Sequence, residues 1–313
     1  MTISRSTKVL GIEGVRLTLD GEPFFLQGLS FFNALYNPNF NASAEARLHW
    51  LTKSQATGVN CLRIWCQWDF RAPRVFIDVG PEQTMFTDAG ELCEEPLARL
   101  VSLIETSDRL GMVVEVTLFA NERSPYFLPI AAQERATHHL TDQLRPYGNL
   151  ILQIWNEQSA EVVRFYEIVR AVDPQRIVTS SPGISNVLGD EVQNGAFDVL
   201  TPHTLRHEAF PFWYLAPEQI RFLLDAFQKP VIDDEPARSG PVQFGGISGG
   251  TQPRQHIEHI RRTRSVGGYH IYHHDMFQYG YGHPLTPPSG IPDPDFSAFH
   301  RQVFDYLRDH TTW

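Results

Sequence analysis

The sequence predicts an α/β fold, a (β/α)8 TIM barrel with an N-terminal β-hairpin, on three observations. Short apolar runs alternate with helical patterns eight times, which is typical of strand–helix units around a parallel sheet. The length of 313 residues suits such a barrel as one domain. No linker, repeat or low-complexity segment divides the sequence, so a single domain over residues 1–313 is expected.

The chain begins with a hairpin pattern that we expect to plug the barrel floor. Residues 15–19 alternate between apolar and polar, Asp20 and Gly21 supply a turn, and residues 24–26 return. The expected barrel strands are short apolar runs bounded by turn or helix signals: 24–32, 60–67, 112–119, 150–155, 177–180, 199–202, 231–234 and 269–273. The expected helices are 44–57 with Ser43 as N-cap, 96–110, 130–144, 160–172, a short one near Val187, 217–227, 253–264 and 295–308.

Composition and charge exclude several classes of function. The net charge is -10 and no run of Lys or Arg occurs, so the sequence predicts no basic surface for nucleic acid or an anionic membrane. A neutral small molecule is the expected partner. Cys61, Cys66 and Cys93 have no metal-binding spacing, which favours a reducing compartment. Because the sequence shows no secretory signal and no long apolar stretch, a cytoplasmic location is expected.

Two glutamates follow apolar strands that the pattern places across the barrel from each other. Glu157 ends the run that begins at Leu150, and Glu235 ends the run that begins at Lys229. The carboxyl ends of barrel strands form the catalytic face. Hydrolysis of a glycosidic bond needs one acid to protonate the leaving oxygen and one carboxylate to attack the anomeric carbon, so the pair predicts a glycosidase. Asn156 is expected to hydrogen-bond the sugar 2-hydroxyl.

Further motifs accompany these glutamates over nearly the whole chain: Asp20-Gly-Glu-Pro-Phe24 with Gly28, Gly58-Val-Asn-Cys-Leu-Arg63, Trp155-Asn-Glu157, His203, and Lys229-Pro-Val-Ile with Glu235. With them the chain resembles the clan of glycoside hydrolases whose catalytic glutamates end strands four and seven, and most closely family 5 and its mannanase-like members. The resemblance implies a retaining reaction on a β-linked oligosaccharide or glycoside, with Glu157 as acid/base and Glu235 as nucleophile. It also implies that Arg63 keeps Glu235 ionised, that His203 lines the site, and that no metal or organic cofactor takes part.

The sequence departs from family 5 at three strand ends. Thr117 and Phe119 stand where cellulases carry an Asp-x-His pattern. Leu205 stands where the family has a Tyr that bonds the nucleophile, and Tyr269-His-Ile-Tyr-His-His-Asp275 replaces a Trp platform on strand eight. The candidates to replace the missing Tyr are Tyr269, Tyr272 and Arg206.

Four other side chains are expected to bind substrate. Trp68 and Trp213 fall in predicted loops, which favours them as sugar platforms over a buried role. Tyr269 and His273 on strand eight complete the set, with His274 as an alternative to His273.

Several alternatives stay open at this point. The missing Tyr and Trp motivate a catalytically silent sugar-binding barrel. The late histidines motivate a metal-dependent, amidohydrolase-type barrel, although strand one lacks that class's His-x-His pair; His256 and His259 are instead expected on a solvated helix. The glycine-rich stretch 244–251 is expected to form a mobile lid, with a phosphate site as the alternative.

The neighbours of the two key side chains leave two further alternatives. Asp233 or Asp234 could be the true catalytic partner, and strand alternation would point Asp234 away from the barrel lumen. Arg63 could form a structural ion pair with Glu115 on the next strand, alone or together with its contact to Glu235.

Overall fold

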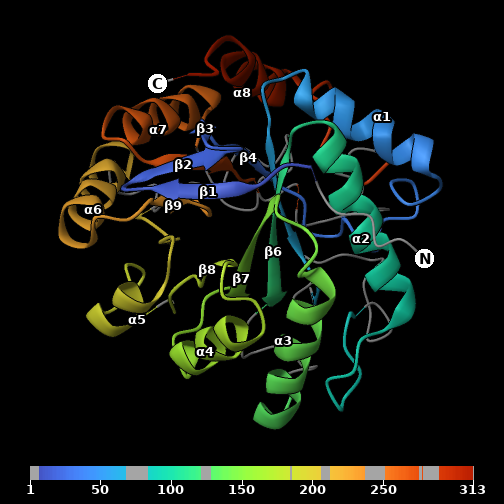
Figure 1. Ribbon diagram of the computed structural model, residues 1–313. Helices are drawn as coiled ribbons and strands as arrows, with labels where there is room; N and C mark the ends of the chain where they lie inside the picture. The colour runs from blue at the N-terminus through green and yellow to red at the C-terminus, as the bar shows by residue number, and fades with distance from the viewer. Residues whose placement is uncertain are drawn as a thin grey trace.

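The computed structural model describes residues 7–67, 84–120, 128–183, 185–205, 212–236, 251–274, 277 and 289–312. Within these residues, a small antiparallel sheet lies over one end of a parallel sheet, and helices surround the parallel sheet in chain order (Figure 1). The predicted α/β barrel fold is confirmed. A single domain over the whole chain stays a prediction.

The parallel sheet has the order β8-β7-β6-β5-β4-β10-β9 in the described part of the chain, and all its pairings are parallel. Its strands are β4 (Gln27–Ser30), β5 (Cys61–Trp65), β6 (Val113–Phe119), β7 (Leu150–Trp155), β8 (Ile177–Thr179), β9 (Ile232–Asp233) and β10 (Tyr269–Tyr272). Counted from β4, β7 is the fourth barrel strand. The predicted fourth strand, 150–155, is confirmed to the residue.

The predicted sixth strand, 199–202, forms no regular strand, but its backbone closes the barrel. The Asp198 N–H donates to the Val178 carbonyl beside β8, and the Leu200 N–H donates to the Pro230 carbonyl. Leu200 also makes an isolated parallel bridge to Val231. The segment stays short because Pro202 has no N–H to continue the ladder. With it counted, β9 is the seventh barrel position.

The described helices are α1 (Ala44–Gln55), α2 (Glu94–Arg109), α3 (Ile130–Leu144), α4 (Val162–Val172), α5 (Glu191–Ala196), α6 (Phe212–Phe227), α7 (Pro253–Ser265) and α8 (Ala298–Asp309). Ser43 is the N-cap of α1, as predicted, since its side chain accepts from the Ala46 N–H. The prediction for α6 was wrong at its start: the helix begins five residues before Pro217 and contains that proline. The short helix α5 begins at Glu191, not near Val187.

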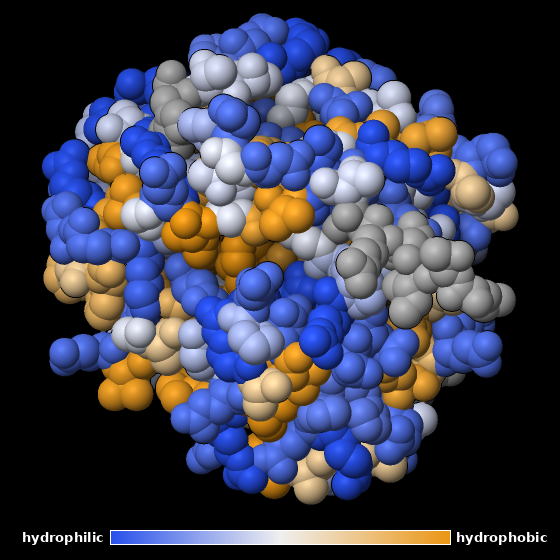
Figure 2. Space-filling view, in the orientation of Figure 1, coloured by the Kyte–Doolittle hydropathy of each residue, from blue (hydrophilic) through white to orange (hydrophobic). Residues whose placement is uncertain are grey.

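The floor of the barrel is plugged by the antiparallel sheet, as predicted. That sheet consists of β1 (Leu10–Glu13), β2 (Arg16–Leu19) and β3 (Glu22–Pro23), so it has one more strand than the expected hairpin. Leu17 of β2 is fully buried and packs with residues at the start of the barrel strands, among them Val113 and Ile151. In Figure 2, hydrophobic residues gather near the centre of this face, over the small sheet.

Most of the core lies between the parallel sheet and the helices. Ile64 of β5 and Phe165 of α4, for example, are fully buried there. Among the described residues, no helix is both long and apolar enough to cross a membrane. The packing between helices and sheet leaves the carboxyl ends of the strands as the place where polar side chains gather.

Candidate active site

Glu157 stands at the turn that follows β7. The strand ends at Trp155, and two residues later Glu157 has a φ of 61°, in the left-handed region that non-glycine residues rarely adopt. A side chain in this region costs on the order of 1–2 kcal/mol, and such strain clusters at functional sites. The backbone therefore holds Glu157 in a conformation that its local sequence does not favour.

Glu157 and Glu235 share one site. One oxygen from each carboxylate and one nitrogen of His203 all lie within 4.8 Å of one another. The Glu157 side chain is 21% exposed, whereas the Glu235 side chain is 4% exposed. One carboxylate thus contacts solvent while the other is enclosed, an asymmetry that suits a pair with two different roles.

His203 lies between the two glutamates. Its Nδ1 is 3.3 Å from Oε1 of Glu157, and its Nε2 is 3.5 Å from Oε2 of Glu235. The imidazole is buried, so each ring nitrogen faces a different carboxylate with little access for bulk water. The structure thus places His203 beside Glu235, and its role in binding substrate stays a prediction.

Arg63, from β5, lies under the pair with no exposed surface. Its Nη1 is 3.5 Å from Oε2 of Glu235, and its Nη2 donates to Oδ1 of Asn156 at 2.7 Å. Its guanidinium carbon lies 4.6 Å from the centre of the Trp65 ring. Arg63 also pairs with Glu115, Nε to Oε1 at 3.5 Å, so the contacts expected from both alternatives for this arginine are present, while its role toward Glu235 stays a prediction.

A hydrogen-bond network centred on Gln153 fills the lumen below Arg63. The Gln153 amide donates to Oε1 of Glu115 at 2.9 Å and to Oδ2 of Asp234 at 2.6 Å, while its oxygen accepts from Arg63 and from Thr117. Ser181 donates to the same Asp234 oxygen at 2.9 Å. These groups, Arg63, Glu115, Gln153, Ser181 and Asp234, are called the lumen network below.

The prediction that Asp234 points away from the lumen was wrong. Alternation in fact holds through Asp234: Ile232 packs in the barrel floor and the Asp234 side chain joins the lumen network. Glu235, beyond the end of β9, also faces the lumen, so an alternation counted from Glu235 has the wrong phase. Asp233 points outward instead, where its Oδ2 lies 2.7 Å from Nε2 of His259 and accepts from Thr204. Asp233 is therefore excluded as a partner of Glu157.

Burial changes the acidity of the two network carboxyls. Desolvation, together with the charge of Asp234, raises the pKa of Glu115 to about 8. Burial also raises the pKa of Asp234, while Arg63, His203 and the Gln153 amide oppose that change. Glu115 therefore holds a proton at neutral pH, whereas Asp234, with more donors and positive charge around it, is the ionised member of the pair.

β10 supplies one of its two predicted substrate-binding residues to the site. Nε2 of His273 is 3.9 Å from Oε1 of Glu235, and its Nδ1 is 3.0 Å from the Ser30 hydroxyl. The expectation that Tyr269 binds substrate is wrong. Tyr269 is four residues before His273 and lies at the barrel floor, where its hydroxyl accepts from the Leu17 N–H at 2.7 Å. Tyr269 is thus too deep in the barrel to contact substrate.

The group that replaces the missing strand-six Tyr is not one of the candidate tyrosines. Tyr269 lies at the floor, and the Tyr272 hydroxyl lies 2.8 Å from Nδ1 of His300, on the helix side of the sheet. Arg206 lies outside the described residues. His203 and His273 are the described groups that flank Glu235 instead.

The two tryptophan predictions have different outcomes. Trp68 lies outside the described residues, as does the glycine-rich stretch 244–251. Trp213 is not in a loop but in the first turn of α6, half-buried, with its ring centre 6.2 Å from that of Tyr214. Its role as a sugar platform stays a prediction.

The late histidines occupy a buried layer between β10 and the last two helices. His256 and His259 are almost fully buried, so the prediction that they lie on a solvated face was wrong. His274, the alternative to His273, is buried and points away from the site. The centre of its ring lies 4.6 Å from the centre of the His300 ring. We define the outer histidine layer as His256, His259, His270, His274 and His300.

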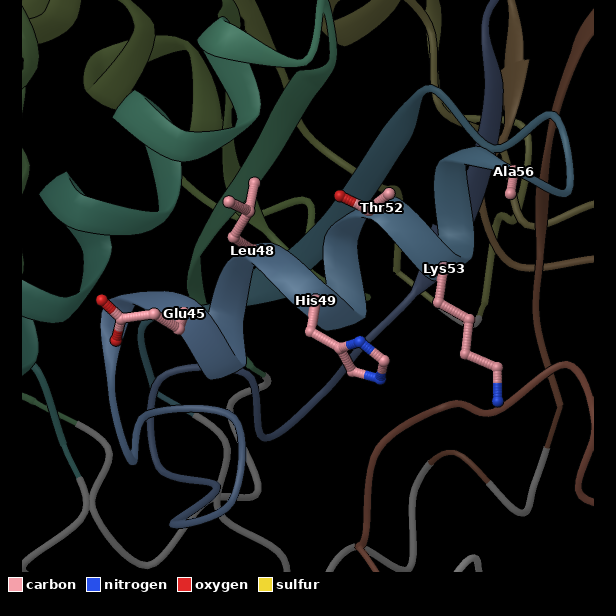
Figure 3. A pocket seen from close by; sticks show the side chains of 6 residues that line it. All are labelled: Glu45, Leu48, His49, Thr52, Lys53 and Ala56. Atoms are coloured by element: carbon pink, nitrogen blue, oxygen red, sulfur yellow. The ribbon is translucent and has the colours of Figure 1, made fainter.

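A shallow hollow on the outer surface of α1 offers no comparable site. Figure 3 shows its side chains spreading along one helix rather than converging on a point: Glu45, Leu48, His49, Thr52, Lys53 and Ala56. Lys53 is already paired with Asp293 at 2.6 Å. The convergent polar groups of the described chain therefore lie at the barrel mouth.

The fold of this parallel barrel is similar to that of solved glycoside hydrolases of family 5. Three solved structures illustrate the similarity. A family 5 glycoside hydrolase from Bacteroides vulgatus has a TM-score of 0.66 and 13% identity, over 96% of this chain and 68% of that one. A family 5 mannosidase from Rhizomucor miehei has a TM-score of 0.65 and 13% identity, over 96% and 97%. A beta-1,4-D-mannanase from Cryptopygus antarcticus has a TM-score of 0.63 and 12% identity, over 96% and 94%.

These similarities confirm the predicted resemblance at the level of the fold. No protein-family model and no curated protein matches the sequence. Fold similarity at 12–13% identity does not carry an activity from one chain to another. Function must therefore be argued from the site.

Proposed function

We propose that this protein is a retaining β-glycoside hydrolase in which Glu157 is the acid/base and Glu235 the nucleophile. The observation that carries the proposal is the approach of the two carboxylates, with an oxygen of each within 4.8 Å of the other. Retaining glycosidases hold their carboxyl groups about 5–5.5 Å apart, whereas inverting ones need about 6.5–9.5 Å to fit a water. The spacing thus supports double displacement.

The proposed reaction has two steps. A Glu235 oxygen attacks the anomeric carbon as the glycosidic C–O bond breaks, and Glu157 gives its proton to the leaving oxygen, so that an alcohol departs and a glycosyl ester remains. Glu157 then takes a proton from water, whose oxygen attacks the same carbon and releases Glu235. Asn156, held by Arg63 through its Oδ1, keeps its amide N–H groups for the sugar 2-hydroxyl.

A β-mannoside is the first substrate to test. The fold neighbours include mannanases and a mannosidase, one mutant of which was solved in complex with mannosyl-fructose. We therefore propose a short β-linked oligosaccharide or glycoside as substrate, and a cytoplasmic location stays a prediction. Aryl β-mannosides, glucosides and galactosides would be screened with the wild type, and proton NMR would follow which anomer forms first. Initial release of the α-anomer from any β-glycoside would contradict retention.

The nucleophile is tested by Glu235→Ala, which should abolish turnover of every substrate. The matched control is Glu161→Gln, an exposed carboxylate four residues past Glu157, which should retain wild-type turnover. Activity of more than a few per cent in folded Glu235→Ala would refute the assignment.

A catalytically silent sugar-binding barrel is the second candidate, favoured by Leu205 and by the absence of Trp from β10. Turnover of an aryl β-glycoside that is lost in Glu157→Ala and restored by azide would exclude it. Azide can attack the glycosyl-enzyme without general-base help, so rescue requires an intermediate on Glu235.

The metal-dependent candidate is less compatible with the site geometry. Ligands about 2.0–2.1 Å from a tetrahedral zinc lie about 3.3–3.5 Å from one another. Here the three candidate ligand atoms spread over as much as 4.8 Å, and His203 turns a different nitrogen to each glutamate. Loss of turnover on treatment with a chelator would revive this candidate.

A further inference from the structure

The lumen below the proposed catalytic pair holds an unusual balance of charge. Arg63 faces three carboxyls: Asp234 at 3.1 Å, Glu115 at 3.5 Å and Glu235 at 3.5 Å. Arg63, Glu115 and Asp234 have no exposed surface, and the Glu235 side chain is 4% exposed. Three buried negative charges beside one positive charge would be strongly unfavourable, because burial penalises each charge that is not paired.

A proton on Glu115 relieves this imbalance. Each carboxyl has one oxygen without a hydrogen-bond partner among the described residues, Oε2 of Glu115 and Oδ1 of Asp234. The other oxygen of Glu115 accepts from Gln153, whereas Oδ2 of Asp234 accepts from both Gln153 and Ser181. Asp234 also lies closer to Arg63, at 3.1 Å against 3.5 Å for Glu115. Ionisation therefore favours Asp234, consistent with the raised pKa of about 8 for Glu115. At neutral pH the charge of Arg63 is then divided between Asp234 and Glu235.

We propose that Asp234 is a positioning residue that draws part of the positive charge of Arg63 away from Glu235, so that the nucleophile keeps a net negative charge. This inference rests on the proposed function. A carboxylate fully paired with a guanidinium is a weaker nucleophile and stabilises a positively charged sugar ring less well. Asp234 itself does not react in this proposal. It keeps Arg63 from neutralising Glu235, which does react.

The groups that face Asp234 and Glu235 come from every side of the barrel. They are Arg63 on β5, Glu115 on β6, Glu157 after β7, His203 after the sixth barrel segment and His273 after β10. Nε2 of His203 lies 3.5 Å from both Asp234 Oδ1 and Glu235 Oε2, so it interacts electrostatically with both carboxylates. A change of charge at Asp234 therefore acts on Glu235 through Arg63 and His203 together.

The test is the pH profile of kcat/KM, whose acidic limb reports ionisation of the essential base in the free enzyme. Asp234→Asn keeps the shape of the side chain but removes its charge, so that Glu235 is the one carboxylate of the three around Arg63 that remains charged at neutral pH. The acidic limb should move down by about one pH unit, the size of shift that one charge at contact distance produces, and kcat should fall. Asp234→Glu keeps the charge, so its limb should stay in place.

Glu115→Gln is the matched control, since it alters the other network carboxyl without altering charge at neutral pH. Its acidic limb should coincide with that of the wild type. If Asp234→Asn does not fold, Ser181→Ala loosens Asp234 by removing its 2.9 Å hydrogen bond and should move the limb in the same direction by less.

The outcomes separate this inference from the proposed function. An unmoved limb in active Asp234→Asn, or in Ser181→Ala where the first variant does not fold, would overturn the role of Asp234 but leave the glycosidase standing. Equal shifts in Asp234→Asn and Glu115→Gln would also overturn it, because the effect would not be specific to Asp234. A wild type that neither turns over aryl β-glycosides nor is labelled on Glu235 by activated 2-deoxy-2-fluoro glycosides would instead overturn the proposed function itself.

Discussion

The two faces of the barrel wall carry two buried polar regions of opposite character. The lumen network is held by ion pairs and by hydrogen bonds that converge on Gln153. The outer histidine layer packs ring against ring, as in the contact of His256 with Tyr272 at 5.7 Å between ring centres. Along β10 and the two residues that follow it, alternate residues separate the two regions: His273 points inward, whereas His270 and His274 point outward.

The difference shows that a buried polar cluster is not by itself a sign of chemistry. In the outer layer burial lowers the pKa of His270 and His274 well below its usual value, so these rings remain neutral. In the lumen burial acts on acids and raises the pKa of Glu115. The lumen network holds ion pairs beside an opening to solvent, which fits a reaction site, while His270 and His274 of the outer layer are uncharged and pack against other rings.

The largest expected effect comes from removing the cation of the lumen network. Arg63→Met removes the buried cation that Glu115, Asp234 and Glu235 share. It should lower the free energy of unfolding by about 3–5 kcal/mol, measured by urea denaturation. Arg47→Met is the matched control, since this buried arginine donates to the neutral groups Ser102 and Asn41. Equal losses in the two variants would show that the lumen network has no special electrostatic role.

The second prediction concerns how the outer histidine layer changes the stability of the protein at acidic pH. Because the folded pKa values of His270 and His274 are lowered, protonation favours the unfolded chain, and stability is lost as pH falls below about 6.5. The slope of the free energy of unfolding against pH should approach about 1.4 kcal/mol per pH unit for each such histidine. Urea denaturation between pH 7 and pH 5 measures it, and His274→Phe should reduce the slope by one proton. An unchanged slope would mean that His274 does not carry the effect.

The third prediction gives the lumen network the opposite dependence on pH. The folded pKa of Glu115, about 8, lies above its unfolded value, so the stability that its proton confers is present at low pH and lost as pH rises toward 8. Glu115→Gln should therefore be more stable than wild type at pH 8 by up to about 5 kcal/mol, at roughly 1.4 kcal/mol per pKa unit over the rise from 4.5 to about 8. The gain should shrink toward pH 5. Glu167→Gln, on the exposed face of α4, should show neither effect.

The smallest effect tests the placement of Tyr269 at the floor. Tyr269→Phe removes the hydrogen bond from the Leu17 N–H and should cost about 1 kcal/mol of stability. Activity should match the wild type, since the ring does not reach the barrel mouth. A rise in KM without loss of stability would return Tyr269 to the substrate site.

The sequence predicts those parts of the fold and site that depend on local pattern. The predicted bounds of α3 and β7 match those of the structure. Glu157 and Glu235 could be placed together because the carboxyl ends of barrel strands meet at one face, and Arg63 and His203 followed from the resemblance to family 5. A further signal for the lumen network was present in Glu115 and Gln153, polar residues at inward positions of otherwise apolar strands.

The errors arise where tertiary contacts decide. The orientation of Asp234 was wrong because both Asp234 and Glu235 face the lumen: alternation holds through Asp234, and the chain turns beyond the end of β9 in a way that no local pattern predicts. His256 and His259 have a polar appearance in sequence, yet β10 and α8 cover them. The start of α6 was misplaced because Pro217 suggests a helix start, whereas the structure includes it within the helix.

The left-handed backbone at Glu157 has a consequence for how this protein could change over time. Glycine would occupy that conformation without strain, so the easiest route to a more stable turn deletes the carboxylate. Selection for stability alone would erase the site at this position, and selection for turnover must act against it. A lineage that kept the barrel but lost the need for its reaction should show the change here first.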